Sequence, residues 1–160
     1  MFTIYSADVI GNPANCIYPH EQKILDESTL KAAVSHDYVC AEYKNGYRSN
    51  DNFLGSDCLA VDCDNDHSEN PEDWVTPDDV RAVFPDVTFA IHYSRNHMKA
   101  KAGKQARPKF HVLFPIEYIS DAELYNDMKK QINCLFPFFD TKALDAARFF
   151  FGTNPADVEV

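Results

Sequence analysis

Hydrophobic residues occur along this chain in short runs of two different periods. Four runs have the length of a strand, and in the third the large apolar side chains occupy every second position. The predicted strands cover residues 58–63, 87–93, 110–115 and 147–151.

Two amphipathic helices are predicted between these strands. The first covers residues 77–84, because Thr76 is a good N-cap, Pro77 suits the first helical position and two acids follow. The second covers residues 121–135, after a capping-box pattern that begins at Ser120. Its apolar positions at helical spacing, which we expect to be buried, are Leu124, Met128, Ile132 and Leu135.

The order strand–helix–strand–strand–helix–strand is the split βαβ, ferredoxin-like pattern of an α+β fold. In that fold the first and third strands lie antiparallel in the centre of the sheet, and the fourth lies beside the first. We therefore predict a single domain over residues 1–160. It would consist of an RRM-like palm at 56–155 and a small α/β lobe at 1–55 that packs beside the sheet.

The lobe has the less regular pattern. A helix is predicted at 26–35, a strand at 38–43 and a hairpin turn at Asn45-Gly46. No internal repeat or low-complexity linker separates it from the remainder of the chain.

The first of the four strands ends in acids at alternate positions. Side chains two residues apart point to the same face of a strand, so Asp62 and Asp64 would project together. Neighbouring carboxylates repel each other, and a divalent cation such as Mg²⁺ or Mn²⁺ removes that cost. The alternative is a strand that simply runs into an acidic, solvated turn, and this segment alone favours neither.

Charge is distributed unevenly. The net charge of −10 by itself disfavours a nucleic-acid partner. However, residues 87–116 contain no acid, so this segment would attract phosphate unless it is merely a solvated basic loop. Its basic residues are Arg95, Lys99, Lys101, Lys104, Arg107 and Lys109.

Composition restricts the class of protein further. With 45% hydrophobic residues, the chain has the composition of a folded domain. No apolar run approaches membrane-spanning length, and the N-terminal residues lack the basic-then-apolar pattern of a signal peptide. The five cysteines form no CxxC pair, so we expect reduced thiols, no zinc site and a cytoplasmic protein.

The predicted sheet brings three polar sets to one end, because neighbouring antiparallel strands start and finish at the same edge. The apolar faces of the first and third strands would pack on the helices, so we expect the acids of the first strand and His111 on the opposite, open face. The three sets are Asp62 with Asp64, Lys109 with His111, and Asp140 with Asp145 and Arg148.

Together these motifs resemble the archaeo-eukaryotic primase superfamily, in particular primase-polymerases of phages, plasmids and integrated elements. The family combines a strand ending in paired acids, a strand with a histidine two places after a small polar or basic residue, and an acid after an apolar pair followed by an arginine. The matching residues are Asp62-Cys63-Asp64, Lys109-Phe110-His111, and Asp140 with Arg148. The resemblance covers about residues 55–153.

The resemblance implies a DNA primase or polymerase that transfers nucleotides on a single-stranded DNA template or primer-template. It would act in the replication of a phage or mobile element in a bacterial cytoplasm, and a helicase, fused or separate, could act with it. Asp62, Asp64 and Asp140 would be the catalytic residues and hold two Mg²⁺ or Mn²⁺ ions, with Asp145 open as the alternative to Asp140. The residues expected to contact the NTP or dNTP are His111, Lys109, Arg107, Arg148 and Ser94. Those expected to contact nucleic acid are Arg95, Lys99, Lys101 and Lys104.

The chain also departs from the family. Many members carry a second arginine three positions after the first, where this chain has Phe151. Because the chain ends at Val160, soon after the third motif, we expect a catalytic core or minimal member that extends primers better than it starts them. Two alternatives remain: a non-catalytic, RRM-like nucleic-acid-binding replication module, and another ferredoxin-like two-metal phosphotransfer enzyme such as a cyclase or phosphodiesterase.

Overall fold

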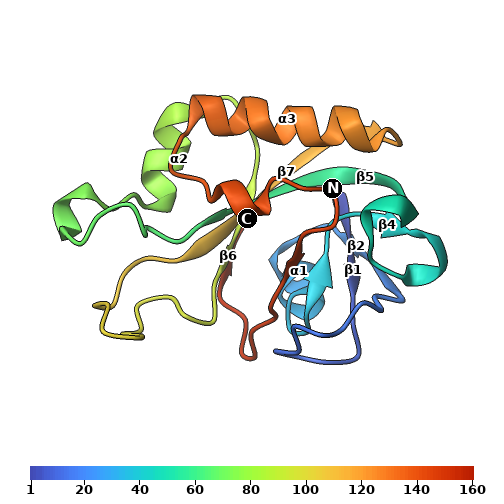
Figure 1. Cartoon of the computed structure of the whole chain (residues 1–160), viewed down its shortest axis with the longest axis horizontal. Helices are drawn as coiled ribbons and strands as arrows, with labels where there is room; N and C mark the ends of the chain where they lie inside the picture. Colours follow the sequence, from blue (N-terminus) through green and yellow to red (C-terminus); the bar gives the residue numbers. More distant parts are fainter.

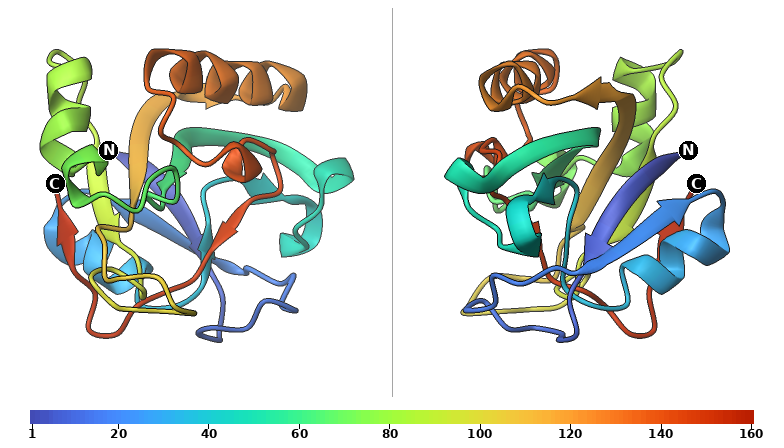
Figure 2. Two further views of the ribbon diagram at one scale, coloured as in Figure 1. Left: turned by 60° about the vertical axis from the view of Figure 1, so that its left-hand side comes forward. Right: turned by 90° about the vertical axis from the view of Figure 1, so that its right-hand side faces the viewer.

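Two antiparallel sheets pack face to face, and two helices cover the outer face of the larger sheet (Figure 1, Figure 2). The computed structural model describes residues 1–160. The five-stranded sheet has the order β4 (Glu42–Tyr43), β5 (Phe53–Cys63), β7 (Phe110–Ile119), β6 (Ala90–Tyr93) and β9 (Val158–Glu159). The four-stranded sheet has the order β2 (His20–Ile24), β1 (Phe2–Ser6), β3 (Tyr38–Val39) and β8 (Phe149–Phe150). The α+β class predicted from the sequence is confirmed.

The helices lie close to their predicted positions. They are α1 (Glu27–Ala33), α2 (Pro77–Val83) and α3 (Ala122–Leu135), and short 3-10 helices cover Lys44–Gly46, Asn50–Asn52, Pro71–Asp73 and Thr141–Ala143. Helix α2 begins as predicted, since the N–H and hydroxyl of Thr76 both donate to the Asp79 carboxylate. Helix α3 begins differently: its N-cap is Asp121 rather than Ser120, and the Asp121 carboxylate accepts from two N–H groups of the first turn.

Strands β5 and β7 form the centre of the larger sheet, as predicted for the first and third strands. They are antiparallel, and their register places Asp62 opposite His111. Strand β6 pairs with the other edge of β7. On the helix side, the apolar faces of β5 and β7 contribute six side chains to one core with α2 and α3: Leu59, Val61, Cys63, Phe110, Val112 and Phe114.

The fourth strand does not lie where the split βαβ pattern puts it. Strand β8 pairs with β3 in the four-stranded sheet, and the short strand β4 takes the place beside β5. The reason is packing: the ring of Phe150 stacks on that of Tyr38, with centroids 5.4 Å apart, inside the core between the two sheets. The prediction that the fourth strand pairs with the first is therefore wrong.

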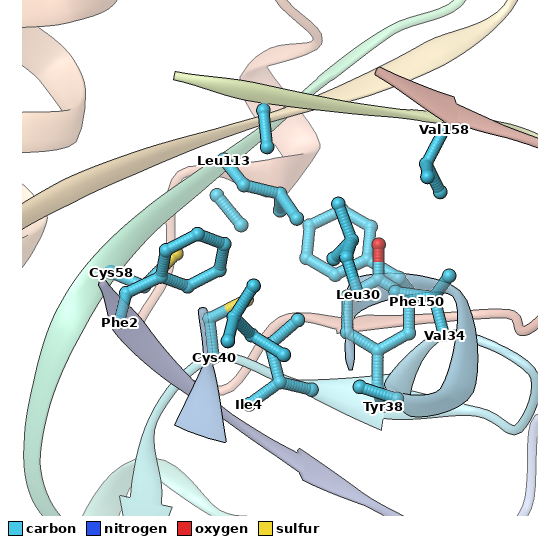
Figure 3. Close-up of a cluster of buried hydrophobic side chains, with 14 residues drawn as sticks. Phe2, Ile4, Leu30, Val34, Tyr38, Cys40, Cys58, Leu113, Phe150 and Val158 are labelled. Atoms are coloured by element: carbon cyan, nitrogen blue, oxygen red, sulfur yellow. The ribbon is translucent and has the colours of Figure 1, made fainter. Parts of the chain in front are cut away.

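The face of the five-stranded sheet that we expected to be open is covered. The four-stranded sheet and α1 pack on it through a cluster of 14 buried residues, several of which are labelled in Figure 3. Cys58 and Leu113 enter this cluster from the larger sheet, and Phe2 and Ile4 enter it from β1. His111 and Asp62 are consequently buried at the edge of an inter-sheet core.

The predicted strand at 38–43 is divided between the sheets. Residues of β3 pair with β1, those of β4 pair with β5, and the buried pair Cys40-Ala41 connects them. Asn45 and Gly46 both have positive φ, as a tight turn requires. They belong, however, to a connection between β4 and β5 that is longer than the predicted hairpin turn.

Helix α3 turns inward a face that matches the prediction only in part: Met128 and Ile132 are half-buried and pack against the core. Tyr125 and Lys129 are buried, whereas Leu124 is 49% and Leu135 is 65% exposed. Both buried side chains have a backbone acceptor: Tyr125 donates to the carbonyl of Cys58 at 2.8 Å, and Lys129 donates to the carbonyls of Ala143 at 3.2 Å and Asp145 at 3.1 Å. Polar ends that find a partner therefore displaced the leucines from the interior.

Two further predictions concern composition. All five cysteines are free thiols. None of the helices combines the length and the apolar character that a membrane crossing requires.

Candidate metal centre

Three carboxylates meet at the end of β5. Asp62 is the penultimate residue of that strand, Asp64 follows its end, and Asp140 caps the 3-10 helix Thr141–Ala143. One oxygen of each lies within 4.8 Å of the others. The N–H of Asp140 donates to the carbonyl of Asp62 at 2.7 Å, so a loop segment rather than a paired strand brings the third acid to this place. Asp145, the alternative third acid, is exposed and lies outside the group.

Asp62 is the most buried of the three, at 5% exposure. Its Oδ2 accepts from Arg148 at 3.2 Å, while its buried Oδ1 has no hydrogen-bond donor. Burial raises the pKa of Asp62 to about 6; Arg148 opposes that rise and the charge of Asp140 adds to it. A buried carboxylate oxygen without a donor beside two further acids is a donor set that a hard divalent cation fits.

Asp64 faces Lys109 across the rim of the site. The Lys109 ammonium lies 3.4 Å from Asp64 Oδ1 and 3.6 Å from Asp66 Oδ1. Burial and the neighbouring charge of Asp62 raise the pKa of Asp64, and Lys109 opposes them. Arg148 pairs with Asp62, rather than with Asp145 three residues earlier, and so brings a second cation to the acids.

His111 lines the pocket beside Asp62 and Asp64, but its ring is largely buried and also contacts protein groups. It is 5% exposed, its Nδ1 lies 3.2 Å from the Tyr38 hydroxyl, and its Nε2 lies 3.5 Å from Asp62 Oδ1. Both ring nitrogens thus face protein groups. Burial lowers the pKa of His111 to about 3, and Arg148 lowers it further, so the ring is neutral at pH 7.

Arg107, predicted to contact the nucleotide, is turned into the protein. Its side chain is fully buried, and the guanidinium donates to the carbonyls of Asn65 and Ser68 and to the Glu69 carboxylate. It also lies over the ring of Trp74, 5.2 Å from the centroid. These hydrogen bonds make Arg107 the anchor of the loop after β5. Because the guanidinium is buried, it is not exposed to contact a phosphate.

Asp62 and Asp64 line a pocket of about 200 Å³, and the predicted nucleotide-binding residues Ser94, His111 and Arg148 form part of its wall together with Arg95 and Lys101. Ser94 is fixed by its N–H, which donates to the carbonyl of Lys109 at 2.9 Å. The Arg95 guanidinium lies 3.7 Å from the centroid of the Phe151 ring. Phe151, which stands where the family has its second arginine, therefore holds a cation in place by stacking.

The basic loop, residues 94–109 between β6 and β7, borders this pocket. Lys99, Lys101 and Lys104 are exposed, and an antiparallel bridge joins Lys101 to Lys104 around a tip at Ala102 and Gly103 with positive φ. An adjoining cavity of about 310 Å³ is lined by these lysines together with Lys109 and two acids. The cations that the sequence grouped in one segment thus lie next to the carboxylates.

Two residues of the site were not predicted from the sequence. Tyr38 comes from the four-stranded sheet and His92 from β6, and both reach the back of His111. The register of β6 with β7, which pairs His92 with His111, was the one clue available from the predicted topology.

Comparisons with known proteins give no further indication. No family model, no curated protein and no solved structure matches this chain.

Proposed function

We propose that this chain is the catalytic domain of a primase-polymerase-type nucleotidyltransferase. The observation that carries the proposal is the meeting of Asp62, Asp64 and Asp140 within 4.8 Å at the end of a central strand. The family resemblance implied these residues as a set, with Asp145 as the alternative to Asp140, and they come from two segments almost 80 residues apart.

The three acids would hold Mg²⁺ or Mn²⁺, and the bound cations would offset the charge of a nucleoside triphosphate and lower the pKa of an attacking 3′-hydroxyl. The side chains around them have complementary tasks. Arg148 pairs with Asp62 and lines the pocket, and Lys109 pairs with Asp64 and lines the adjoining cavity. In phosphoryl transfer this positioning and charge neutralisation provide most of the catalysis.

The finer fold assignment belongs to this proposal. Strands β5, β6 and β7 with helices α2 and α3 would form an RRM-like palm that lacks the usual fourth strand. In it the acids occupy the end of the first central strand, and the basic loop connects the second strand to the third. That loop would follow the sugar–phosphate backbone of a single-stranded DNA template or primer.

The decisive experiment is nucleotide incorporation on single-stranded DNA, with and without a primer, in Mg²⁺ or Mn²⁺. We expect primer extension by the wild-type chain and at least about a hundredfold loss in Asp62→Asn and Asp140→Asn, since each removes a cation ligand. Asp145→Asn is the matched control, because it removes an exposed acid from the same segment, and it should retain incorporation.

Two results would contradict the proposal. One is full incorporation by the double variant Asp62→Asn with Asp64→Asn. The other is metal-dependent shortening of the labelled DNA in place of extension, which would assign the acids to a phosphodiesterase.

A further inference from the structure

We propose that Tyr38 and two buried histidines form a chain of polar contacts that positions the Asp62 carboxylate. The inference rests on the function proposed above and assigns residues that neither the motifs nor the acids themselves identify. In order, the members of this tyrosine–histidine chain are Thr153, His92, Tyr38, His111 and Asp62.

The chain is continuous. The Tyr38 hydroxyl lies between the two imidazoles, 2.9 Å from His92 Nδ1 and 3.2 Å from His111 Nδ1. At one end His92 Nε2 lies 2.8 Å from the hydroxyl of Thr153. At the other end His111 Nε2 lies 3.5 Å from Asp62 Oδ1, the buried oxygen that has no hydrogen-bond donor.

Only one direction of donation is consistent with an ionised Asp62. An unprotonated Nε2 would point its lone pair at an ionised Asp62 oxygen 3.5 Å away, so His111 carries its proton on Nε2, and its Nδ1 then accepts from Tyr38. The contact between Nε2 and Oδ1 is too long for a hydrogen bond, so Oδ1 still has no donor. The Tyr38 oxygen in turn accepts from His92 Nδ1–H, whose Nε2 accepts from Thr153. The 3.3 Å contact between the two Nδ1 atoms agrees, since one carries a proton and the other does not.

Burial keeps this arrangement fixed. Tyr38 and His92 are fully buried, and desolvation lowers the pKa of both histidines, so neither ring gains a second proton at pH 7. Phe150 packs on both Tyr38 and His111, with ring centroids 5.4 and 4.6 Å away. Figure 3 shows the Tyr38 ring beside Phe150 inside the cluster that joins the sheets.

The consequence concerns how Asp62 is held. Protein groups that contact a metal-binding side chain fix its orientation, and their loss typically lowers metal affinity by about ten- to a hundredfold. The Tyr38 hydroxyl comes from β3. The four-stranded sheet therefore contributes to a site whose acids lie at the end of β5 and just before the 3-10 helix Thr141–Ala143. Tyr38 and His92 are positioning residues that act through His111.

The first test uses Tyr38→Phe, which removes the bridging oxygen and keeps the ring. We expect its Mn²⁺ affinity, measured by titration calorimetry, to fall roughly tenfold. Tyr125→Phe is the matched control, because it also removes one buried hydroxyl, which donates to the Cys58 carbonyl on the helix side. It should bind Mn²⁺ like the wild type. Equal affinity in the two variants would overturn the inference.

The second test needs no variant and no metal. Side-chain ¹⁵N NMR of the wild-type chain should show His111 as the Nε2–H tautomer and His92 as the Nδ1–H tautomer. The opposite tautomer at His111 would overturn the chain even if Mn²⁺ binds. Conversely, a wild-type protein that binds no Mn²⁺ would remove the proposed function, while the tautomers would still decide whether the chain exists.

Discussion

Asp62 is the residue where the competing demands of this molecule meet. It is buried almost completely, yet one oxygen has no donor and a second acid lies beside it. A carboxylate in these surroundings destabilises the fold unless a cation binds, because desolvation and like charge both disfavour its ionised form. Such a loss of stability in the metal-free protein is what we expect of a site that binds a cation.

Asp62→Asn should therefore stabilise the metal-free protein in a pH-dependent way. The folded pKa of about 6 exceeds the ordinary aspartate pKa of 3.8, so between these values the folded state binds more protons than the unfolded state. Wild-type stability then falls as pH rises through this window, and the variant lacks that fall. From pH 4 to 7 its advantage should grow by up to about 3 kcal/mol, measured by urea unfolding.

The same comparison contains its control. The histidines titrate in both proteins, whereas Asp64, whose pKa the charge of Asp62 raises, contributes to the difference in the same direction as Asp62. Mn²⁺ should stabilise the wild type at pH 7 and leave Asp62→Asn unchanged. A difference that stays constant from pH 4 to 7 would show that Asp62 is not held in its unfavourable state.

At the residue scale, sequence reasoning located the acids because their chemistry is local: alternate positions at a strand end share a face whatever packs around them. It misplaced Arg107 because the environment of that side chain is set by distant segments, and for the same reason it missed that His111, which does line the pocket, also contacts Tyr38. The Asn65 and Ser68 carbonyls bind Arg107, and Tyr38 binds His111. A basic residue or a histidine in a motif shows what its side chain can bind, but the motif does not show which way the side chain points.

Among the elements, α3 shows how period and face are separate predictions. The apolar spacing identified the helix, but the fully buried positions are Tyr125 and Lys129, whereas the predicted Met128 and Ile132 are only half-buried. Lys129 connects this helix to the segment that carries Asp140, because its ammonium donates to the carbonyls of Ala143 and Asp145 at 3.2 and 3.1 Å. The helix thereby holds the third acid of the site in place.

Lys129→Met should weaken that connection. It leaves two carbonyls without their donor, which costs about 1–3 kcal/mol of unfolding free energy, partly offset by removal of a buried charge. We also expect weaker Mn²⁺ binding, because the Asp140 segment is less firmly held. Lys130→Met is the control, since this neighbour is exposed and pairs only with Asp127. Identical Mn²⁺ affinity in the two variants would separate α3 from the site.

For the whole molecule, the sequence predicted the central strands and the convergence of charge but not the second sheet. Strands β1 and β2 have no strong alternation, and β3 and β8 are two residues long, so pairing across the chain rather than local propensity determines them. The convergence survived the error in topology. The chain that leaves Asp140 still crosses the end of β5 on its way to the other sheet, which keeps the acids together.

The distribution of charge over the whole molecule explains how an acidic chain can bind nucleic acid. The net charge is −10, but the exposed lysines of the basic loop lie beside the carboxylates. Replacing Lys99, Lys101 and Lys104 by alanine should therefore weaken binding of single-stranded DNA and lower its dependence on salt. Each lost phosphate contact changes the slope of log affinity against log salt by roughly 0.7, so three give about 2.

A matched variant makes this a test of position rather than of total charge. Alanine at Lys23, Lys31 and Lys44 removes the same charge from exposed positions in the N-terminal elements. If the basic loop follows the DNA backbone, that variant keeps the wild-type slope, because its lysines lie outside the loop and the pocket. Equal slopes for the two triple variants would mean that the chain responds only to net charge, and the loop would then be a solvated turn.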